Sequence, residues 1–143
     1  MIGRPNLCDS EFANKAYAGK AEDIRPCIGC GRCLNGIMFG KPISCTVNPS
    51  VETNAIEKAT EKKKVLVIGG GPAGMEAAYV AKKRGHEVVL CEKSNELGGL
   101  LRIAAVPISK QELCKVIKFM ARRLQNEGIE VRMNCEVTPE MLE

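Results

Sequence analysis

The stretch "KVLVIGGGPAGMEAA", residues 64–78, decides the fold of this chain. Residues 64–69 form a continuous aliphatic and β-branched run that ends in glycine, which is typical of a strand buried on both faces of a parallel sheet. Pro72 stands where the first turn of a helix tolerates proline, and the sequence predicts a helix over residues 73–84. A buried strand, a glycine turn and a helix in direct succession indicate the α/β class.

The glycines of this stretch follow the G-x-G-x-x-G pattern at Gly69, Gly71 and Gly74. The first glycine allows a tight strand-to-helix turn, the second lets the backbone approach a pyrophosphate, and the third lets the helix lie close to the strand. The N-terminus of the helix also carries a partial positive charge that suits a diphosphate. The plainer alternative is that these glycines make a tight turn and nothing more.

A second buried strand is predicted over residues 86–92, and Glu92 ends it 18 residues after Gly74. This spacing is close to the roughly 20 residues expected for the acid that holds the ribose hydroxyls. Glu92 should repel a 2′-phosphate, so an ADP moiety fits better than NADP; the alternative is a solvated strand end. The glycine pair at 98–99 either brings a second stretch of backbone close to the pyrophosphate or is a flexible connector. The candidate cofactor-binding residues here are Gly69, Gly71, Ala73, Gly74, Glu92, Lys93, Gly98 and Gly99.

The remainder of the chain continues the alternation of strands and helices. Ser109 and Glu112 have the spacing of a capping box, which predicts a helix running to about Asn126. Residues 129–137 alternate apolar and polar side chains, as a strand does, and Thr138-Pro139 is typical of a helix start. The sequence thus predicts a Rossmann-like, three-stranded parallel βαβαβ unit. The predicted apolar face of the long helix comprises Leu113, Val116, Ile117, Met120 and Leu124.

Four cysteines precede this unit in residues 27–49, "CIGCGRCLNGIMFGKPISCTVNP", with spacing C-x2-C-x2-C-x11-C. The first three match the start of a bacterial ferredoxin run. Structural zinc sites more often use two C-x2-C knuckles that lie further apart. The spacing therefore favours a 4Fe-4S cluster on an irregular cysteine-rich segment, with a four-thiolate zinc site and free thiols as alternatives. The candidate metal ligands are Cys27, Cys30, Cys33 and Cys45.

The other charged and sulfur-bearing residues carry less information. Cys8, Cys91, Cys114 and Cys135 are scattered and are interpreted as small buried apolar residues. Basic residues flank the cysteine loop, and they either offset the charge of a cluster or are ordinary solvated cations. These flanking residues are Arg25, Arg32 and Lys41.

Composition narrows the class of protein. The net charge of +4 is mild, which argues against a nucleic-acid partner. No apolar run approaches the roughly 18 residues of a membrane span, and the N-terminus lacks the apolar region of a signal peptide. We therefore expect a cytoplasmic protein, in which eight cysteines indicate metal or redox chemistry rather than a disulfide framework.

The motifs "IRPCIGCGRCL", "SCTVNP", "VLVIGGGPAGMEAA" and "EKSNELGGLL", in this order, resemble one family. They are similar to the iron–sulfur flavoenzymes of the old yellow enzyme group. That group includes 2,4-dienoyl-CoA reductase, 2-enoate reductase and trimethylamine dehydrogenase. The resemblance covers essentially the whole chain.

The resemblance implies a division of the chain. Residues 1–26 would be the end of an FMN-binding TIM barrel, with Gly3-Arg4 at the FMN phosphate. Residues 27–49 would bind the 4Fe-4S cluster and 50–63 would be a linker. Residues 64–143 would be the first part of an FAD domain, or of a domain that binds only ADP. The chain would then be a fragment whose partner is the rest of the parent polypeptide, including the barrel and an NAD(P)H domain.

The resemblance also implies an electron path from NAD(P)H to FAD, through the cluster to FMN, and on to an activated C=C bond of a small-molecule substrate. The fragment, in which we identify no catalytic residue, would bind cofactors without turnover. The spacing of two residues between the second and third cysteines is that of the amine dehydrogenases. Leu100 stands after the second glycine pair, where glutamine is frequent in the family. An amine dehydrogenase, a glutamate-synthase small-subunit type of protein and a non-enzymatic zinc knuckle with an ADP-binding module therefore remain alternatives.

Overall fold

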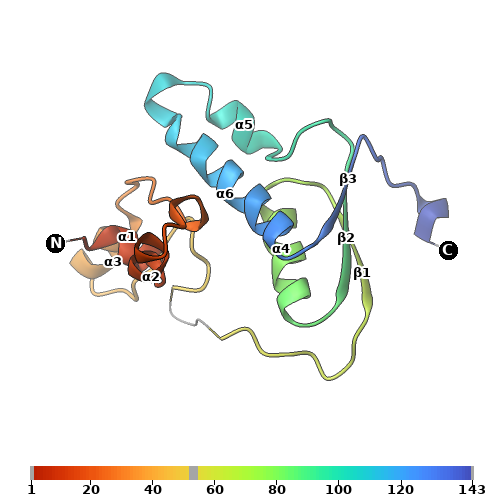
Figure 1. Cartoon of the computed structure of the whole chain (residues 1–143). Coiled ribbons are helices and arrows are strands. Elements are labelled where there is room, and N and C mark those ends of the chain that lie inside the picture. Colours follow the sequence, from red (N-terminus) through yellow and green to blue (C-terminus); the bar gives the residue numbers. More distant parts are fainter. Residues whose placement is uncertain (1, 52–54, 143) are drawn as a thin grey trace. The chain divides into compact units, whose positions relative to one another are not determined.

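The computed structural model describes residues 2–51 and 55–142 (Figure 1). The chain forms two compact units, Met1–Ala55 and Ile56–Glu143. Of the expected linker over residues 50–63, positions 52–54 lie outside the described residues, and residues 55–63 contain no helix or strand. Within the described ranges, no helix is both long and apolar enough to cross a membrane.

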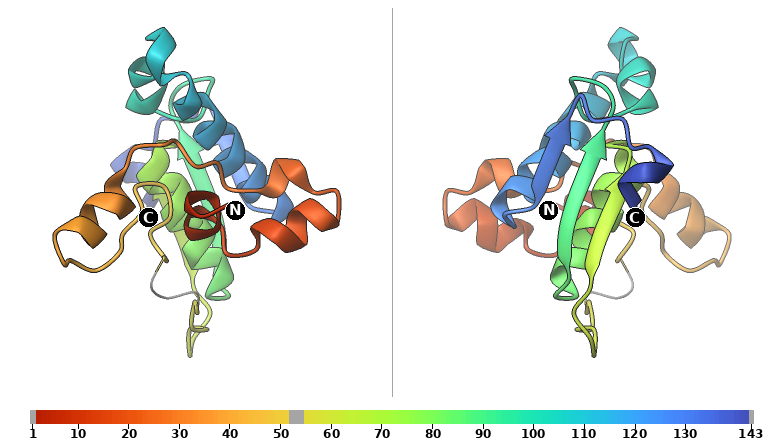
Figure 2. Two further views of the ribbon diagram at one scale, coloured as in Figure 1. Left: turned by 90° about the vertical axis from the view of Figure 1, so that its left-hand side faces the viewer. Right: turned by 90° about the vertical axis from the view of Figure 1, so that its right-hand side faces the viewer.

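The larger unit is built on a parallel sheet of three strands in the order β1-β2-β3. The strands are β1 (Lys64–Ile68), β2 (Glu87–Glu92) and β3 (Glu130–Met133). Helices α4 (Pro72–Lys83) and α6 (Glu112–Asn126) cover one face of this sheet, and the view in the right half of Figure 2 shows the strands in front of them. The predicted Rossmann-like α/β fold is confirmed.

The core of this unit lies between the sheet and its two helices. Met75 and Ala78 of α4, Leu90 of β2 and Leu124 of α6 are completely buried. Leu90 and Val88 are two apart on β2, so they point to the same face of the sheet, and both are buried. The sheet and the helices therefore share one aliphatic core, as the sequence pattern predicts.

A charged side chain lies in the contact between α4 and α6. Arg123 of α6 is 9% exposed and forms an ion pair with Glu76 of α4. Its guanidinium lies 3.8 Å from the centre of the Tyr79 ring, also on α4. The predicted apolar face of α6 is therefore incomplete, because Phe119 and Arg123 belong to its buried side as well.

The predicted capping box at the start of α6 is wrong. Ser109 lies inside a 3-10 turn, η2 (Ile108–Lys110), which follows the short helix α5 (Leu100–Ala104). Gln111 is the N-cap of α6, and no side chain caps this end. The 3-10 turn places Ser109 before the cap position, so its hydroxyl does not serve as the cap. The end of the helix at Asn126 is as predicted.

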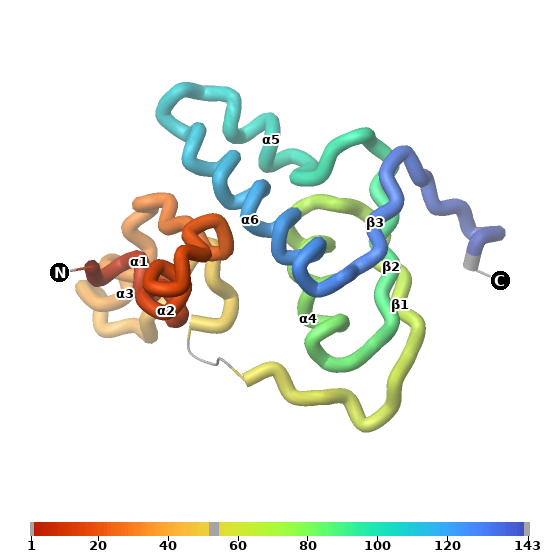
Figure 3. The backbone as a smooth tube through the Cα atoms, in the orientation of Figure 1, coloured from red at the N-terminus to blue at the C-terminus, as the bar shows by residue number. Residues whose placement is uncertain are grey.

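The third strand is shorter than the predicted range of residues 129–137. β3 ends at Met133 because Asn134 adopts a left-handed conformation with φ 53°, which asparagine tolerates better than most residues. The chain then leaves the sheet on the side away from α4 and α6 (Figure 3). A 3-10 turn, η3 (Pro139–Leu142), begins at the predicted proline.

The smaller unit consists of short helices joined by loops. These are α1 (Arg4–Cys8), α2 (Phe12–Tyr17), the 3-10 turn η1 (Ala21–Asp23) and α3 (Arg32–Met38). Helix α2 falls within the part of the chain before the cysteine loop, and α3 begins inside that loop. The cysteines of the loop are therefore held partly by irregular backbone and partly by the first turn of α3.

Candidate functional site

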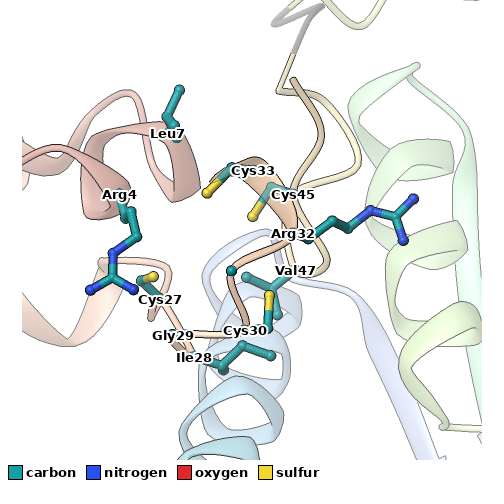
Figure 4. Close-up of a pocket in the computed structure, with 11 residues that line it drawn as sticks. Arg4, Leu7, Cys27, Ile28, Gly29, Cys30, Arg32, Cys33, Cys45 and Val47 are labelled. Atoms are coloured by element: carbon teal, nitrogen blue, oxygen red, sulfur yellow. The ribbon is translucent and has the colours of Figure 1, made fainter. Parts of the chain in front are cut away.

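The four predicted metal ligands line one pocket of the smaller unit. The pocket has a volume of about 320 Å³, including the part open to solvent. Figure 4 shows the sulfur atoms of Cys27, Cys30, Cys33 and Cys45 directed toward the shared space. Gly31 has φ 74° and is the N-cap of α3, so the chain turns directly from Cys30 into the helix that carries Cys33. The spacing in the sequence thus corresponds to one common pocket.

The thiol of Cys30 lies in an environment that favours the thiolate. Its sulfur is 3.2 Å from the Thr46 hydroxyl. The hydrogen bond from Thr46, followed by one from the backbone N–H of Arg32, lowers the pKa of Cys30 below its usual value. The thiolate is the form that binds metals. In the residues that the structure describes, no three His, Cys, Asp or Glu side chains are arranged to hold a single metal ion.

A fifth cysteine, Cys8, lies near the pocket in a different environment. It is 1% exposed, and its S–H donates to the carbonyl of Pro26 at 3.3 Å. Burial, with the nearby Cys45 and Cys27 thiols as further causes, raises the pKa of Cys8 to about 12. Cys8 therefore stays a neutral thiol, and its interpretation as a small buried residue is confirmed.

The basic residues around the loop have separate roles. The guanidinium of Arg4 lies beside Cys27 at the pocket, whereas that of Arg32 points away from the sulfur atoms (Figure 4). Arg32 instead donates from Nε to the Ser44 hydroxyl at 3.0 Å. Lys41 is exposed and is not among the pocket residues. Arg4, which the resemblance assigns to the FMN phosphate, is thus the cation whose head group faces the thiols.

A buried polar network holds the segments on either side of the cysteine loop. Both carboxylate oxygens of Asp9 accept hydrogen bonds, from the backbone N–H of Arg25 at 2.8 Å and of Glu11 at 3.0 Å, and from Lys15 Nζ at 2.6 Å. Burial opposes ionisation of Asp9, but these bonds outweigh it and lower its pKa. Asp9 thereby fixes the backbone two residues before Cys27.

Asn48 completes this network on the other side of the loop. Its Oδ1 accepts from the Arg25 guanidinium at 2.6 Å and from the Ser50 N–H at 3.1 Å, and its Nδ2 donates to the Leu7 carbonyl at 3.2 Å. Arg25 also donates to the Val47 carbonyl at 3.0 Å. The sequence pattern did not identify Asn48 or Asp9 as part of this network. They are recognised by their burial, because buried polar side chains are rare unless they are hydrogen-bonded.

In the larger unit, the predicted glycines gather at the carboxyl end of β1. A Cβ on Gly74 would lie 1.9 Å from the Gly69 carbonyl oxygen, so only glycine fits this approach of α4 to the turn. The second glycine pair lies against the first loop: the Gly98 N–H donates to the Gly70 carbonyl at 2.8 Å, and a Cβ on Gly99 would lie 3.2 Å from Gly71 Cα. The 98–99 pair is therefore part of this loop cluster.

Glu92 is bonded to the same loop. It is 8% exposed; Oε2 accepts from the Gly70 N–H at 2.6 Å, and Oε1 accepts from the N–H and hydroxyl of Ser94, both at 2.8 Å. The Ser94 and Gly70 N–H bonds lower the pKa of Glu92. A carboxylate has about four acceptor positions, so these three bonds occupy most of them. Sequence reasoning did not anticipate that Glu92 positions the glycine loop.

The loop cluster fits an ADP diphosphate. Nothing lies within 4 Å of the position that a Cβ on Gly71 would take, so a ligand has room to approach the backbone there. The N–H groups of Ala73 and Gly74 lie in the first turn of α4, where a helix provides no partner of its own. Lys93, next to Glu92, is exposed. These features are the ones expected of a phosphate-binding loop in a Rossmann-like fold.

Comparison with known proteins identifies the family. The sequence pattern described as "FAD dependent oxidoreductase" matches residues 64–139, more than half of the chain. The chain therefore belongs to the FAD dependent oxidoreductase family, whose members use a flavin cofactor.

Similar proteins extend the match to the cysteine unit. The chain is 38% identical to cinnamate reductase from Clostridium sporogenes, over 97% of this chain and 22% of the relative. Among solved structures, 2-naphthoyl-CoA reductase with 2-naphthoyl-CoA is 33% identical over 97% of this chain and 22% of its own, with a TM-score of 0.90. Histamine dehydrogenase from Rhizobium sp. 4-9 is 29% identical over 99% of this chain and 22% of its own, with a TM-score of 0.88. The chain spans about a fifth of the length of these proteins.

Asn48→Ala should loosen the smaller unit. The change removes one acceptor of Arg25 and the donor to the Leu7 carbonyl, and the loss of hydrogen bonds to a buried group costs about 1–3 kcal/mol. Hydrogen–deuterium exchange should show faster exchange in peptides from residues 2–51. Asn35→Ala, which alters an exposed side chain of α3, is the matched control. Equal exchange in the two variants would contradict the role of Asn48.

Glu92→Gln should weaken the acid dependence of stability of the larger unit. Because the pKa of Glu92 is lower in the folded state, its ionised form contributes stability above the unfolded pKa of about 4.3, and that contribution is lost as the pH falls through the folded value. Urea denaturation followed by circular dichroism at several pH values below about 6 measures this loss. The variant should lose less stability on acidification than the wild type. Glu112→Gln, at an exposed position, should keep the wild-type slope; a wild-type slope in Glu92→Gln would refute the assignment.

Proposed function

We propose that this chain is the electron-transfer portion of an NAD(P)H-dependent flavin and iron–sulfur oxidoreductase. In this proposal, electrons pass from FAD through a 4Fe-4S cluster to FMN and reduce an activated C=C bond of an enoate or dienoyl-CoA type. The observation that carries the proposal is the pocket of four thiols placed in the chain directly before a domain of the FAD dependent oxidoreductase family.

Cys27, Cys30, Cys33 and Cys45 would hold the cluster. A cluster carries one electron at a time, whereas a flavin also exchanges electrons in pairs with a hydride donor. The residues around the thiols suit a negatively charged group. Arg4 supplies a cation at the pocket, and the Thr46 hydroxyl lies against the Cys30 sulfur. Hydrogen bonds to sulfur and nearby charge are the means by which a protein tunes such a centre.

The ADP part of FAD would lie on the loop cluster of the larger unit. Gly71 leaves room for the diphosphate, and the N–H groups of Ala73 and Gly74 would donate to it. Glu92 would accept a ribose hydroxyl at its remaining acceptor position while its other bonds hold the loop. Gly69, Gly98 and Gly99 shape the loop, and the exposed Lys93 stands at its edge.

The other parts of the electron path would lie in the rest of the parent polypeptide. The boundaries at residues 26, 49 and 63, the FMN-binding barrel, the NAD(P)H domain and the place of Arg4 near the FMN phosphate belong to this proposal, as does cytoplasmic localisation. It is supported by relatives, such as the cinnamate reductase of Clostridium sporogenes, of which this chain covers 22%. This chain alone would bind cofactors without turnover.

One observation favours a second candidate, an amine dehydrogenase in which electrons leave FMN through the cluster. Histamine dehydrogenase from Rhizobium sp. 4-9 matches 99% of the chain with a TM-score of 0.88. Rapid mixing of the full-length parent with NADH or NADPH separates the two candidates. Bleaching of the flavin absorbance by the nicotinamide supports the reductase, and bleaching only by an amine supports the dehydrogenase.

Anaerobic reconstitution with iron and sulfide should load the chain with about four irons and four sulfides, because four thiolates are the ligand set of a 4Fe-4S cluster. The dithionite-reduced protein should give the electron paramagnetic resonance spectrum of a reduced cluster. Cys30→Ser should lower the iron content, whereas Cys114→Ser, at an exposed cysteine of α6, should not. A product with one zinc and no iron would instead support the zinc-knuckle alternative.

The larger unit should bind ADP, as isothermal titration calorimetry can measure. Gly71→Leu should weaken ADP binding by at least about tenfold, because the new side chain fills the approach to the phosphate. The backbone of Gly71 is extended (φ −71°, ψ 175°), which leucine adopts without strain, and nothing lies within 4 Å of the position of the added Cβ. Glu87→Leu, at the opposite end of β2, is the control and should bind as the wild type does. Equal affinities would refute the diphosphate position.

A further inference from the structure

Two cysteines outside the metal pocket come together in the larger unit. Cys91 is the last residue but one of β2 and is 2% exposed. Cys135 follows β3 and is partly buried. Both fall within the strands that the sequence predicts, over residues 86–92 and 129–137. Cys135 lies outside any strand, and the structure brings it to Cys91.

The turn at Asn134 produces this contact. Cys91 pairs in register with Arg132 of β3, so a regular continuation of β3 would carry residue 135 past the end of β2. Asn134, with φ 53°, turns the chain instead. Its N–H donates to the Ser94 carbonyl at 3.0 Å, and the Cys135 N–H donates to the Glu92 carbonyl at 2.9 Å. The backbone of Cys135 is thus fixed beside the residue that follows Cys91.

The two side chains interact directly. Burial is the main reason that the pKa of Cys91 is raised, and a hydrogen bond with the Cys135 thiol is the next. The Cys91 side chain lies on the face of the sheet away from α4 and α6, because it shares the orientation of its register partner Ile68, which is 62% exposed. The segment after β3 leaves the sheet on this same side (Figure 1).

We propose that Cys91 and Cys135 are a redox-active dithiol pair that closes to an intramolecular disulfide when a peroxide oxidises it. The sulfur of Cys135, the more exposed of the two, attacks the O–O bond of hydrogen peroxide, giving a sulfenic acid and one water. The sulfur of Cys91 then displaces the sulfenic oxygen as a second water, and the S–S bond forms. Two thiols lose two electrons and two protons, and one peroxide becomes two waters. A small dithiol reverses the reaction by exchange.

Neither Cys114 of the larger unit nor Cys8 of the smaller unit shares this arrangement. Cys114 is exposed on α6, contrary to its interpretation as a buried residue, because it lies on the solvent side of that helix. Cys8 is bonded to the Pro26 carbonyl. The disulfide would join the end of β2, directly before Glu92, to the segment after β3. The inference does not depend on the proposed function, since neither cysteine belongs to the cluster pocket.

Peptide mapping tests the proposal on the whole chain. Trypsin releases Cys91 in residues 85–93 and Cys135 in residues 133–143, each with a single cysteine, and Cys114 in residues 111–115. After treatment with hydrogen peroxide, alkylation and digestion without reductant, mass spectrometry should find 85–93 joined to 133–143. This species should exceed any pair containing Cys114 by at least about tenfold, because disulfide formation requires neighbouring sulfurs.

Control treatments show whether the cross-link is a disulfide specific to Cys91 and Cys135 in the folded chain. Dithiothreitol should remove the cross-linked species, and Cys114→Ser should leave its yield unchanged. In urea, where the two segments separate, the preference over pairs with Cys114 should disappear. The proposal fails if peptide 85–93 stays alkylated while Cys135 is oxidised to a sulfinic acid. It also fails if Cys135 pairs with Cys114 as readily as with Cys91 in the folded chain. Both results are read on the wild type, so they do not depend on how a cysteine variant folds.

Discussion

The larger unit depends on the close approach of Gly74 to the carbonyl of Gly69. A single added carbon would overlap that oxygen, so glycine is what allows α4 to begin directly above the end of β1. From this start, α4 buries Met75 and Ala78 against the sheet, and its N-terminus opens onto the loop. The same close contact that seats the helix therefore also creates the place where a diphosphate would bind.

The glycine loop after β1 is held from two sides, by the last residue of β2 and by the loop that follows β2. Glu92 accepts the Gly70 N–H, and Gly98 donates to the Gly70 carbonyl. Gly70 is thus bonded through both of its backbone polar groups. A buried carboxylate is costly unless it is well bonded, and the three bonds to Glu92 meet that cost. Ligand binding at this loop would require little rearrangement, because the backbone is already fixed.

The sequence was sufficient for the features that depend on local pattern. The β-branched runs, the glycine spacing and the cysteine spacing are each short-range signals, and the fold class follows from their order. It was not sufficient where a distant partner decides the outcome. Arg123 is buried because the carboxylate of Glu76 and the ring of Tyr79 lie on another helix. Ser109 is a local exception: it has the right spacing for a cap, but it lies inside a 3-10 turn that ends before the helix begins.

The same limit applies to the smaller unit. The spacing of its cysteines predicted one pocket, but the residues that shape the pocket, Asp9 and Asn48, bond across up to 41 positions of the chain. In the described part of this unit, Cys8 is the only apolar side chain that is fully buried. A unit this small rarely holds together by an apolar core alone, and a bound metal group commonly supplies the difference.

Environment, rather than residue type, separates the cysteines into classes. Hydrogen bonds from Thr46 and the Arg32 N–H favour the charged form of Cys30, while burial against the Pro26 carbonyl keeps Cys8 neutral. Cys91 and Cys135 lie outside both environments and have each other as neighbours. A thiolate with hydrogen-bond donors is suited to a metal, a buried thiol to packing, and a pair of adjacent thiols to two-electron oxidation. The cysteine spacing in the sequence predicts the metal-binding class. The adjacent pair of thiols depends on the turn at Asn134, which the sequence pattern does not predict.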